Sequence, residues 1–255
     1  MNNRKFYITG QSDALHFTNA VLQENGYTVS QAPDKSVTHL LLPVPSFDPT
    51  GNIKGGKPLT DILQQLPKNI TIIGGQLTHP ALAGYNTIDL LEDPIYVAEN
   101  ANITAHCAIR LAMAQLPITL RGCQVLIIGW GRIGKCLATL LKDLGAQVLV
   151  AARKEADRAM LGALGYHAID FATLASALPH CRVVFNTAPY MVLPEALVQH
   201  CSSQCLKIDL ASVKGIDGND VLWARGLPGK DVPETSGALI AHTVIRIIDG
   251  KEFTI

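Results

Sequence analysis

Short runs of consecutive apolar residues alternate along this chain with longer stretches in which apolar residues recur every three or four positions. The short runs are typical of buried parallel strands, and the longer stretches are typical of amphipathic helices. In the first hundred residues we predict strands at 5–9, 39–44 and 70–73, with a helix after the first strand that ends near Asn25, before Gly26. This alternation predicts βαβ units on a parallel sheet.

A second series of the same kind begins after a helical stretch at 103–116, which Pro117 ends. Strands are predicted at 124–128, 147–151, 182–186 and 206–210, with a short run at 221–224. Helices are predicted at 132–144, 155–164 and 194–200. A last helix, Pro233 to Asp249, has its apolar residues on one face and ends before Gly250.

The segment 43–58, PVPSFDPTGNIKGGKP, is rich in proline and glycine and has no apolar periodicity. It follows a predicted strand end, where open α/β sheets place their binding sites. Two interpretations remain open: a binding loop, or a plain surface excursion.

The composition favours a small-molecule function. The 255 residues carry 21 basic and 21 acidic side chains, so neither nucleic acid nor an anionic membrane is an expected partner. No signal peptide and no membrane-spanning run is apparent, so we expect a soluble, cytoplasmic protein.

Six scattered cysteines are expected to be reduced core residues. His200, Cys201 and Cys205 lack a second ligand pair, and we expect no metal site.

Three glycines interrupt the run VLIIGWGRIGKCLATLL. Gly129, Gly131 and Gly134 form G-x-G-x-x-G between a predicted strand and a predicted helix, which is the context of a dinucleotide-binding turn. In such a turn the first glycine permits the tight bend, the second admits a pyrophosphate and the third allows close packing. A turn with no ligand is the alternative. We therefore predict that the residues of this turn bind the cofactor: Gly129, Trp130, Gly131, Arg132, Ile133 and Gly134.

The end of the second strand of this unit selects the cofactor. NAD-binding units place an acidic residue there, whereas this chain has Ala152 and Arg153, followed by Lys154. Arg153 and Lys154 could meet a 2′-phosphate, so we predict NADP. NAD remains possible, with Glu155 as a displaced acid.

Later strand ends supply further candidates. Asn186 and Thr187 end one strand and are expected to contact the cofactor, as is Asp209 at the end of the next. Ser212 and Lys214 follow and are candidate catalytic residues; Lys214 could bind a substrate carboxylate, or could be a solvated loop lysine.

His106, in the helix before the fingerprint, is the candidate for proton transfer, because imidazole titrates near neutral pH. The alternative is a histidine without a catalytic role.

The fingerprint stretch together with FNTAPYMVLP (185–194), IDLAS (208–212) and GLPGKDVPETSG (226–237) resembles the family of the dipicolinate synthase A subunits over about residues 95–250. The resemblance implies NADP-linked oxidation of dihydrodipicolinate, a small dicarboxylate, to dipicolinate in the mother-cell cytoplasm during sporulation, with a flavoprotein as the second subunit. It also implies two doubly wound parallel-sheet domains: a flavodoxin-like domain (1–95) and a Rossmann NADP-binding domain (96–232). A C-terminal helix (233–255) would cross back onto the first domain. Two-domain dehydrogenases of this kind commonly form homo-oligomers.

Two departures from the family fall on the substrate side. Where the family has G-G-D-x-R after its first strand, this chain has Thr9 to Ala14, TGQSDA, without the basic residue. Where the family tends to have Thr-x-Glu-Gly, this chain has Thr104 to Cys107, TAHC. These departures leave two alternatives open: a reductase of another small carbonyl or imine substrate, and a cofactor-binding subunit that is inactive without its partner. The chain lacks the catalytic Arg, Glu and His pattern of 2-hydroxyacid dehydrogenases, which disfavours a 2-hydroxyacid substrate.

Overall fold

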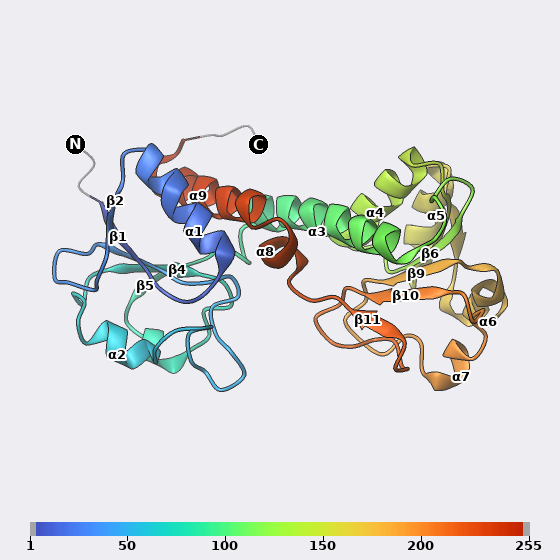
Figure 1. Ribbon diagram of the computed structural model, residues 1–255, viewed down its shortest axis with the longest axis horizontal. Coiled ribbons are helices and arrows are strands. Elements are labelled where there is room, and N and C mark those ends of the chain that lie inside the picture. The colour runs from blue at the N-terminus through green and yellow to red at the C-terminus, as the bar shows by residue number, and fades with distance from the viewer. Residues whose placement is uncertain (1–3, 252–255) are drawn as a thin grey trace. The chain divides into compact units, whose positions relative to one another are not determined.

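A computed structural model describes residues 4–251, and these fold into two compact units. The chain up to Asn100 and from Pro228 onward forms unit 1, and Ala101–Leu227 forms unit 2 (Figure 1). Each unit is built on its own parallel sheet, as the alternating pattern predicts. None of the helices in the described part of the chain is long and apolar enough to cross a membrane.

Unit 1 contains a five-stranded sheet in the order β2-β1-β3-β4-β5. All four strand pairings are parallel, and the order is that of flavodoxin-like folds. The strands are β1 (Lys5–Ile8), β2 (Thr28–Ser30), β3 (His39–Leu41), β4 (Thr71–Gly74) and β5 (Asn86–Asp89). The helices that precede the second unit are α1 (Asp13–Glu24), α2 (Leu59–Leu63) and the 3₁₀ turn η1 (Pro80–Leu82).

The two edge strands of unit 1, β2 and β5, were not predicted. Each pairs with a neighbour on one side only, and each has exposed or half-buried residues in place of a continuous apolar run. The pattern that identifies a buried strand is therefore absent from both.

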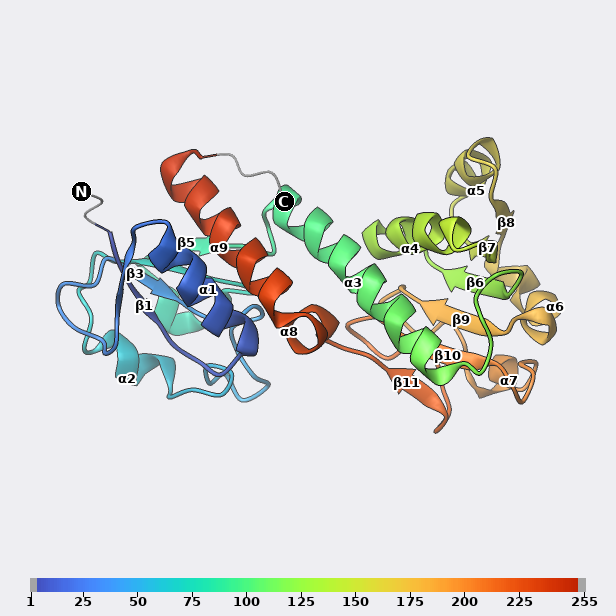
Figure 2. The same ribbon diagram turned by 45° about the horizontal axis from the view of Figure 1, so that its top comes forward.

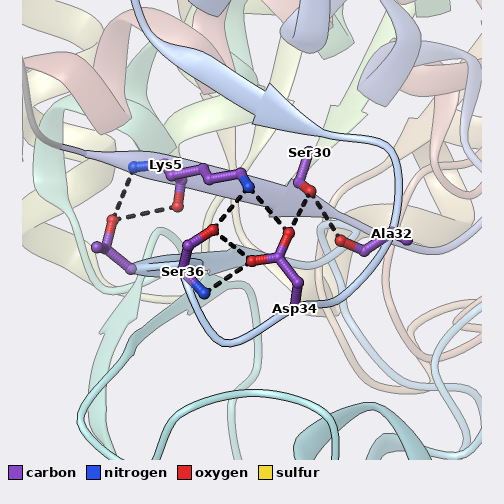
Figure 3. Close-up of polar contacts among 6 residues, drawn as sticks. Lys5, Ser30, Ala32, Asp34 and Ser36 are labelled. Atoms are coloured by element: carbon purple, nitrogen blue, oxygen red, sulfur yellow. Dashed lines mark hydrogen bonds and ion pairs between the residues drawn. The ribbon is translucent and has the colours of Figure 1, made fainter.

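A polar cluster fixes the turn between β2 and β3 (Figure 3). One carboxylate oxygen of Asp34 accepts hydrogen bonds from Lys5 Nζ and Ser30 Oγ, both at 2.9 Å, and the other accepts one from the Ser36 N–H at 2.7 Å. The hydrogen bonds from Ser36 and Lys5 hold the pKa of Asp34 well below its usual range.

Unit 2 contains a six-stranded parallel sheet in the order β11-β10-β9-β6-β7-β8. This is the Rossmann order, in which the chain turns back beside β6 and continues with β9. The strands are β6 (Gln124–Ile128), β7 (Gln147–Ala151), β8 (His167–Ile169), β9 (Val183–Asn186), β10 (Leu206–Asp209) and β11 (Val221–Trp223). The helices are α4 (Arg132–Asp143), α5 (Glu155–Ala163), α6 (Leu174–Ala177) and α7 (Glu195–Val198), with the 3₁₀ turns η2 (Phe171–Thr173) and η3 (Leu178–His180). Helix α3 (Pro94–Gln115) begins in unit 1 and continues into unit 2.

The last two helices, α8 (Leu227–Asp231) and α9 (Pro233–Asp249), return the chain to unit 1. Both ribbon views show α9 lying along α1 (Figures 1 and 2). The Gly237 carbonyl accepts a hydrogen bond from the buried Thr18 hydroxyl at 3.0 Å. Arg246 pairs with Asp93 at 2.7 Å, and Gly250 ends the helix with φ +66°. The predicted return of the last helix is confirmed.

Candidate cofactor site

All the candidate cofactor residues lie at the carboxyl ends of parallel strands in unit 2. β6 and β9 are neighbours in the sheet, and the chain winds away from them in opposite directions. The loops after β6, β7, β9 and β10 therefore emerge at one edge of the sheet. Open α/β sheets bind ligands at this edge, beside the strand where the winding reverses.

Two of the fingerprint glycines are required by close packing. Gly129 has φ +108°, and a Cβ there would approach Thr187 Oγ1 to 2.5 Å. A Cβ on Gly134 would overlap the carbonyl oxygen of Gly129. The strand, its turn and the start of α4 are in contact, and only glycine fits at either position.

Gly131 is different, because no atom lies within 4 Å of where its Cβ would be. It is exposed and is the N-cap residue of α4, with no side-chain hydrogen bond to the helix start. A twelve-residue helix thus begins beside a residue without a side chain, with open space where a Cβ would be. This arrangement fits a pyrophosphate, which such a helix end binds through its N–H groups and its dipole.

The side chains between these glycines are exposed or half-buried, and Trp130 lies just before α4. The Trp130 ring contacts the Tyr166 ring at 5.9 Å between centroids, and Lys135 Nζ lies 5.8 Å from the Trp130 centroid. Arg132 is exposed and Ile133 is half-buried. Trp130 therefore uses its side chain for packing and contributes its backbone to the turn.

The end of β7 presents two cations. Ala151 and Ala152 are buried, while Arg153 and Lys154 are exposed. The Arg153 guanidinium lies 6.0 Å from the Tyr190 ring centroid, so the end of β7 and the loop after β9 meet here.

Arg158, in α5, fixes the backbone at this strand end. It donates hydrogen bonds to the carbonyls of Ala152 and Arg153, both at 2.9 Å. Arg158 thereby fixes the backbone turn that presents Arg153.

Asn186 and Asp209 are completely buried and form a network beneath this edge. The Asn186 amide donates to Asp209 Oδ1 at 2.9 Å and to the Ala188 carbonyl at 3.1 Å, and its oxygen accepts the Ala188 N–H. Asp209 Oδ1 also accepts the Ala211 N–H, and Oδ2 accepts those of Gly215 at 2.6 Å and Ile216 at 3.1 Å. Both side chains are occupied inside the protein, so the geometry gives them the role of positioning the loops.

The loop held by Asp209 carries Ser212 and Lys214. Ser212 is exposed, and Lys214 is half-buried with Nζ 3.3 Å from the Gly218 carbonyl oxygen. Thr187, on the loop after β9, is half-buried and donates to the Ile128 carbonyl at 3.0 Å. The structure thus brings these three residues to the edge that carries the fingerprint.

His106 lies elsewhere in unit 2, on α3, and is not part of the strand edge. Its side chain is exposed, between the buried residues Ala105 and Cys107. Among residues 4–251 no group of three or more His, Cys, Asp or Glu side chains comes together as a metal site.

Unit 1 has a hollow that was not predicted. It lies at the carboxyl ends of β1 and β2, beside the start of α1, and has a volume of about 500 Å³. Its polar lining comes from Gln11, Ser12, Asp13, His16, Asn19, Ser30 and Gln31. The sequence contains a signal for it, because Gly10 (φ +101°) follows the first strand much as Gly129 follows β6.

The proline- and glycine-rich segment 43–58 folds back beside this hollow. Ser46 exchanges hydrogen bonds with Gly75, and the Lys54 carbonyl accepts the Gln11 N–H at 3.0 Å. A Cβ on Gly55 would overlap the Gln11 side chain. The segment is therefore packed against the β1–α1 loop and supports it.

Comparison with known proteins identifies the class of this chain. Residues 98–200 match the sequence profile of the D-isomer specific 2-hydroxyacid dehydrogenase, NAD binding domain, which covers the fingerprint and β6 to β9. Together with the Rossmann sheet and the open turn at Gly131, this match supports an NAD(P)-dependent oxidoreductase.

Within that class, the chain is a homologue of the A subunit of dipicolinate synthase. It is 26% identical to the Bacillus subtilis (strain 168) protein, over 95% of this chain and 87% of the relative. Two solved structures of dipicolinate synthase A subunits have the same fold, one from Bacillus halodurans (TM-score 0.85, 21% identity, 97% of this chain and 98% of that one) and one from B. subtilis (0.84, 23%, 98% and 97%). Transhydrogenase from Sinorhizobium meliloti shares it at a TM-score of 0.70 with 13% identity, over 96% of this chain and 93% of that one.

Proposed function

We propose that this chain is an NADP-dependent oxidoreductase that oxidises dihydrodipicolinate to dipicolinate during sporulation, working in the cytoplasm as a homo-oligomer together with a flavoprotein subunit. The observation that carries the choice of NADP is the end of β7. An exposed arginine and lysine follow two buried alanines at the position where NAD-binding units have a carboxylate. The product and the existence of a second subunit rest on the name of the homologue, and the choice of dihydrodipicolinate and of a flavoprotein rests on the family resemblance.

The fingerprint and the end of β7 would bind the two phosphate-containing parts of NADP. The N–H groups at Gly131 and the start of α4 bind the pyrophosphate, and Arg153 and Lys154 bind the 2′-phosphate. Thr187 supplies a contact on the nicotinamide side. The nicotinamide ring, when bound, accepts the hydride.

The loop after β10 supplies the substrate contacts in this proposal. Lys214 offers a positive charge to a substrate carboxylate, and Ser212 offers a hydroxyl beside it. Asp209 and Asn186 act as positioning residues for this loop and for the loop after β9. His106 lies on α3 outside this edge, and the proposal gives it the proton released on oxidation on the strength of its exposed imidazole alone.

One observation favours a second candidate function, in which this chain is a reductase of another small carbonyl or imine substrate. The residues that line the hollow of unit 1, all of them described, include one aspartate and neither lysine nor arginine. A dicarboxylate in this hollow would meet no fixed positive charge, whereas amide and hydroxyl groups suit a less charged substrate.

The cofactor part of the proposal is tested by isothermal titration with NADP and NAD in parallel. We expect NADP to bind more tightly, and Arg153→Ala to remove most of that preference. Arg121→Ala is the matched control, because Arg121 is exposed in the same unit but precedes β6 at the opposite edge of the sheet. Equal affinities, or a preference that survives Arg153→Ala, would exclude NADP selection by this residue.

The substrate part is tested separately, by following NADPH formation with dihydrodipicolinate, with and without the flavoprotein subunit. Turnover in either condition supports the proposal. Turnover only with the partner would make the isolated chain a cofactor-binding subunit. If NADP binds tightly but no NADPH forms in either condition, the second candidate function is favoured.

A further inference from the structure

The loop after β9 carries an aromatic side chain that the proposed function does not use. Tyr190 is 39% exposed, yet the backbone on both sides of it is fixed. The buried Asn186 side chain exchanges two hydrogen bonds with the backbone of Ala188, at 3.1 and 2.9 Å. The Val192 N–H donates to the Gly215 carbonyl at 2.8 Å. Tyr190 therefore has a defined position at the edge of the sheet, although it is open to solvent.

The Tyr190 ring contacts side chains from two other strand connections. Phe171, in the turn η2 after β8, has its ring centroid 6.4 Å from that of Tyr190, with the two planes inclined by 32°. The guanidinium carbon of Arg153, just after β7, lies 6.0 Å from the Tyr190 centroid. Phe171 packs in turn against the hydrophobic core of unit 2. The core thus supports the Tyr190 ring, and the ring supports the Arg153 guanidinium.

A guanidinium group that rests on an aromatic ring can still bind a phosphate. The attraction to the ring comes from the charge of the group, whereas phosphate oxygens are bound by the N–H groups at its edge. An unsupported arginine side chain loses rotamer freedom when it binds, and this loss weakens the complex. Contact with Tyr190 restricts Arg153 before the ligand arrives. Arg158 holds the Arg153 carbonyl at 2.9 Å, so both the side chain and the backbone of Arg153 are positioned in advance.

We propose that Tyr190 is a positioning residue for cofactor selection, whose ring holds the Arg153 guanidinium where the 2′-phosphate of NADP binds. This inference rests on the proposed function, which assigns that phosphate to Arg153 and Lys154. NAD has a hydroxyl group in place of the phosphate and does not need the guanidinium. The preference for NADP is therefore shared between the end of β7 and the loop after β9.

The test is isothermal titration of the full-length chain with NADP and NAD. Tyr190→Leu removes the ring and should weaken NADP binding by about two- to fivefold, the size of an exposed cation–π contact, while NAD affinity stays unchanged. Tyr190→Phe keeps the ring and should keep the full preference for NADP. Met191→Leu is the matched control, because Met191 is the next residue of the loop and is 45% exposed. Unchanged NAD affinity also shows that each variant is folded.

A double-mutant cycle separates the role of Tyr190 from that of Arg153. With Arg153→Ala already present, Tyr190→Leu should have no further effect, because the ring acts through the guanidinium. An equal loss of NADP affinity in both backgrounds, or a loss for NAD as large as that for NADP, would overturn the inference. If Arg153→Ala removes the preference but Tyr190→Leu retains it, only the role of Tyr190 is refuted. If Arg153→Ala leaves the preference intact, the proposed NADP selection and this inference both fail.

Discussion

Asp209 illustrates how a single side chain can organise a site that it does not touch. Its carboxylate receives four hydrogen bonds, three of them from backbone N–H groups between Ala211 and Ile216 and one from Asn186. Those N–H groups belong to the loop that carries Ser212 and Lys214. A residue with acceptors only is required, because every partner is a donor.

Replacing Asp209 with asparagine should therefore be costly despite the identical shape. In either orientation the new NH₂ group faces two donors, so buried hydrogen bonds are lost, and we expect the free energy of unfolding to fall by about 2 kcal/mol. Urea unfolding measures this, and hydrogen exchange should show faster exchange in residues 211–216. Asp143→Asn, at an exposed position at the end of α4, is the control. Equal effects of both substitutions would contradict the role given to Asp209.

His39 should make unit 1 sensitive to mild acid. Its ring stacks on Phe6 at 4.9 Å, and burial, aided by the charge of Arg4, lowers its pKa from 6.5 to about 4. Above pH 6.5 both the folded and the unfolded state hold a neutral ring. Between pH 6.5 and 4 only the unfolded state gains the proton, so stability falls as the pH falls. The full shift corresponds to about 3 kcal/mol, and because the ring is only partly buried we expect a total loss of about 2 kcal/mol.

Urea unfolding of the full chain at pH 7, 5.5 and 4 measures the dependence that His39 imposes. His39→Gln, which cannot take up a proton in this range, should reduce the loss between pH 6.5 and 4. An unchanged pH dependence in this variant would show that other groups cause it.

Among the elements, the turn from β6 into α4 has two kinds of glycine. Gly129 and Gly134 are there because the strand and the helix touch, whereas Gly131 borders open space. Packing and ligand binding are therefore separable within one short motif.

Alanine substitutions should separate these two roles. Gly134→Ala forces its methyl group against the Gly129 carbonyl and should reduce the free energy of unfolding by about 1–3 kcal/mol. Gly131→Ala should cost less than about 1 kcal/mol as a poorer N-cap, yet weaken cofactor binding about tenfold or more. Thermal unfolding and isothermal titration of both variants distinguish these effects. Unimpaired cofactor binding in Gly131→Ala would exclude the pyrophosphate position proposed here.

The contact between α1 and α9 also depends on one glycine. A Cβ on Gly237 would overlap the Ala14 carbonyl oxygen and lie 2.7 Å from Phe17 Cβ. Gly237→Ala should therefore push the helices apart and destabilise unit 1 by about 1–3 kcal/mol. Gly229→Ala in α8, where no atom lies within 4 Å of the added Cβ, should have little effect. Similar unfolding midpoints for both variants would refute the close packing of α1 and α9.

At the level of the whole chain, unit 1 is assembled from two distant parts of the sequence. The segment from Pro228 onward belongs to it, although all of unit 2 lies between that segment and Asn100 in the chain. Arg246 bonds to Asp93, and Asp249 bonds to Arg4 and Tyr27, so the end of α9 is tied to three separate positions of unit 1. Unit 2 is formed by one continuous stretch.

Removing residues 228–255 should consequently affect the two units unequally. Unit 1 loses the helix that covers α1 and should lose hydrogen-exchange protection in β1 and β3. Strands β6 and β9 should keep theirs, because their partners all lie within 101–227. Mass spectrometry of exchanged peptides measures both units in one sample. Equal loss in the two units, or none in unit 1, would contradict this assembly.

The central elements and the fingerprint could be predicted from the amino-acid sequence alone. Buried strands such as Gln124–Ile128 and long amphipathic helices such as Pro233–Asp249 have a recognisable spacing of apolar residues, because each keeps the same environment along its length. The glycine spacing is equally local, since a tight turn constrains consecutive residues.

Features that depend on distant partners emerge only in the folded chain. The edge strands β2, β5 and β8 exist through pairing with a neighbour rather than through an apolar run of their own. In the sequence, Asp209 resembles a carboxylate at a strand end that is free to bind a ligand. Only the fold shows that it is buried and accepts four hydrogen bonds from the protein. Hydrogen bonding and burial depend on which residues are close in space, and the local sequence does not show which distant residues come together.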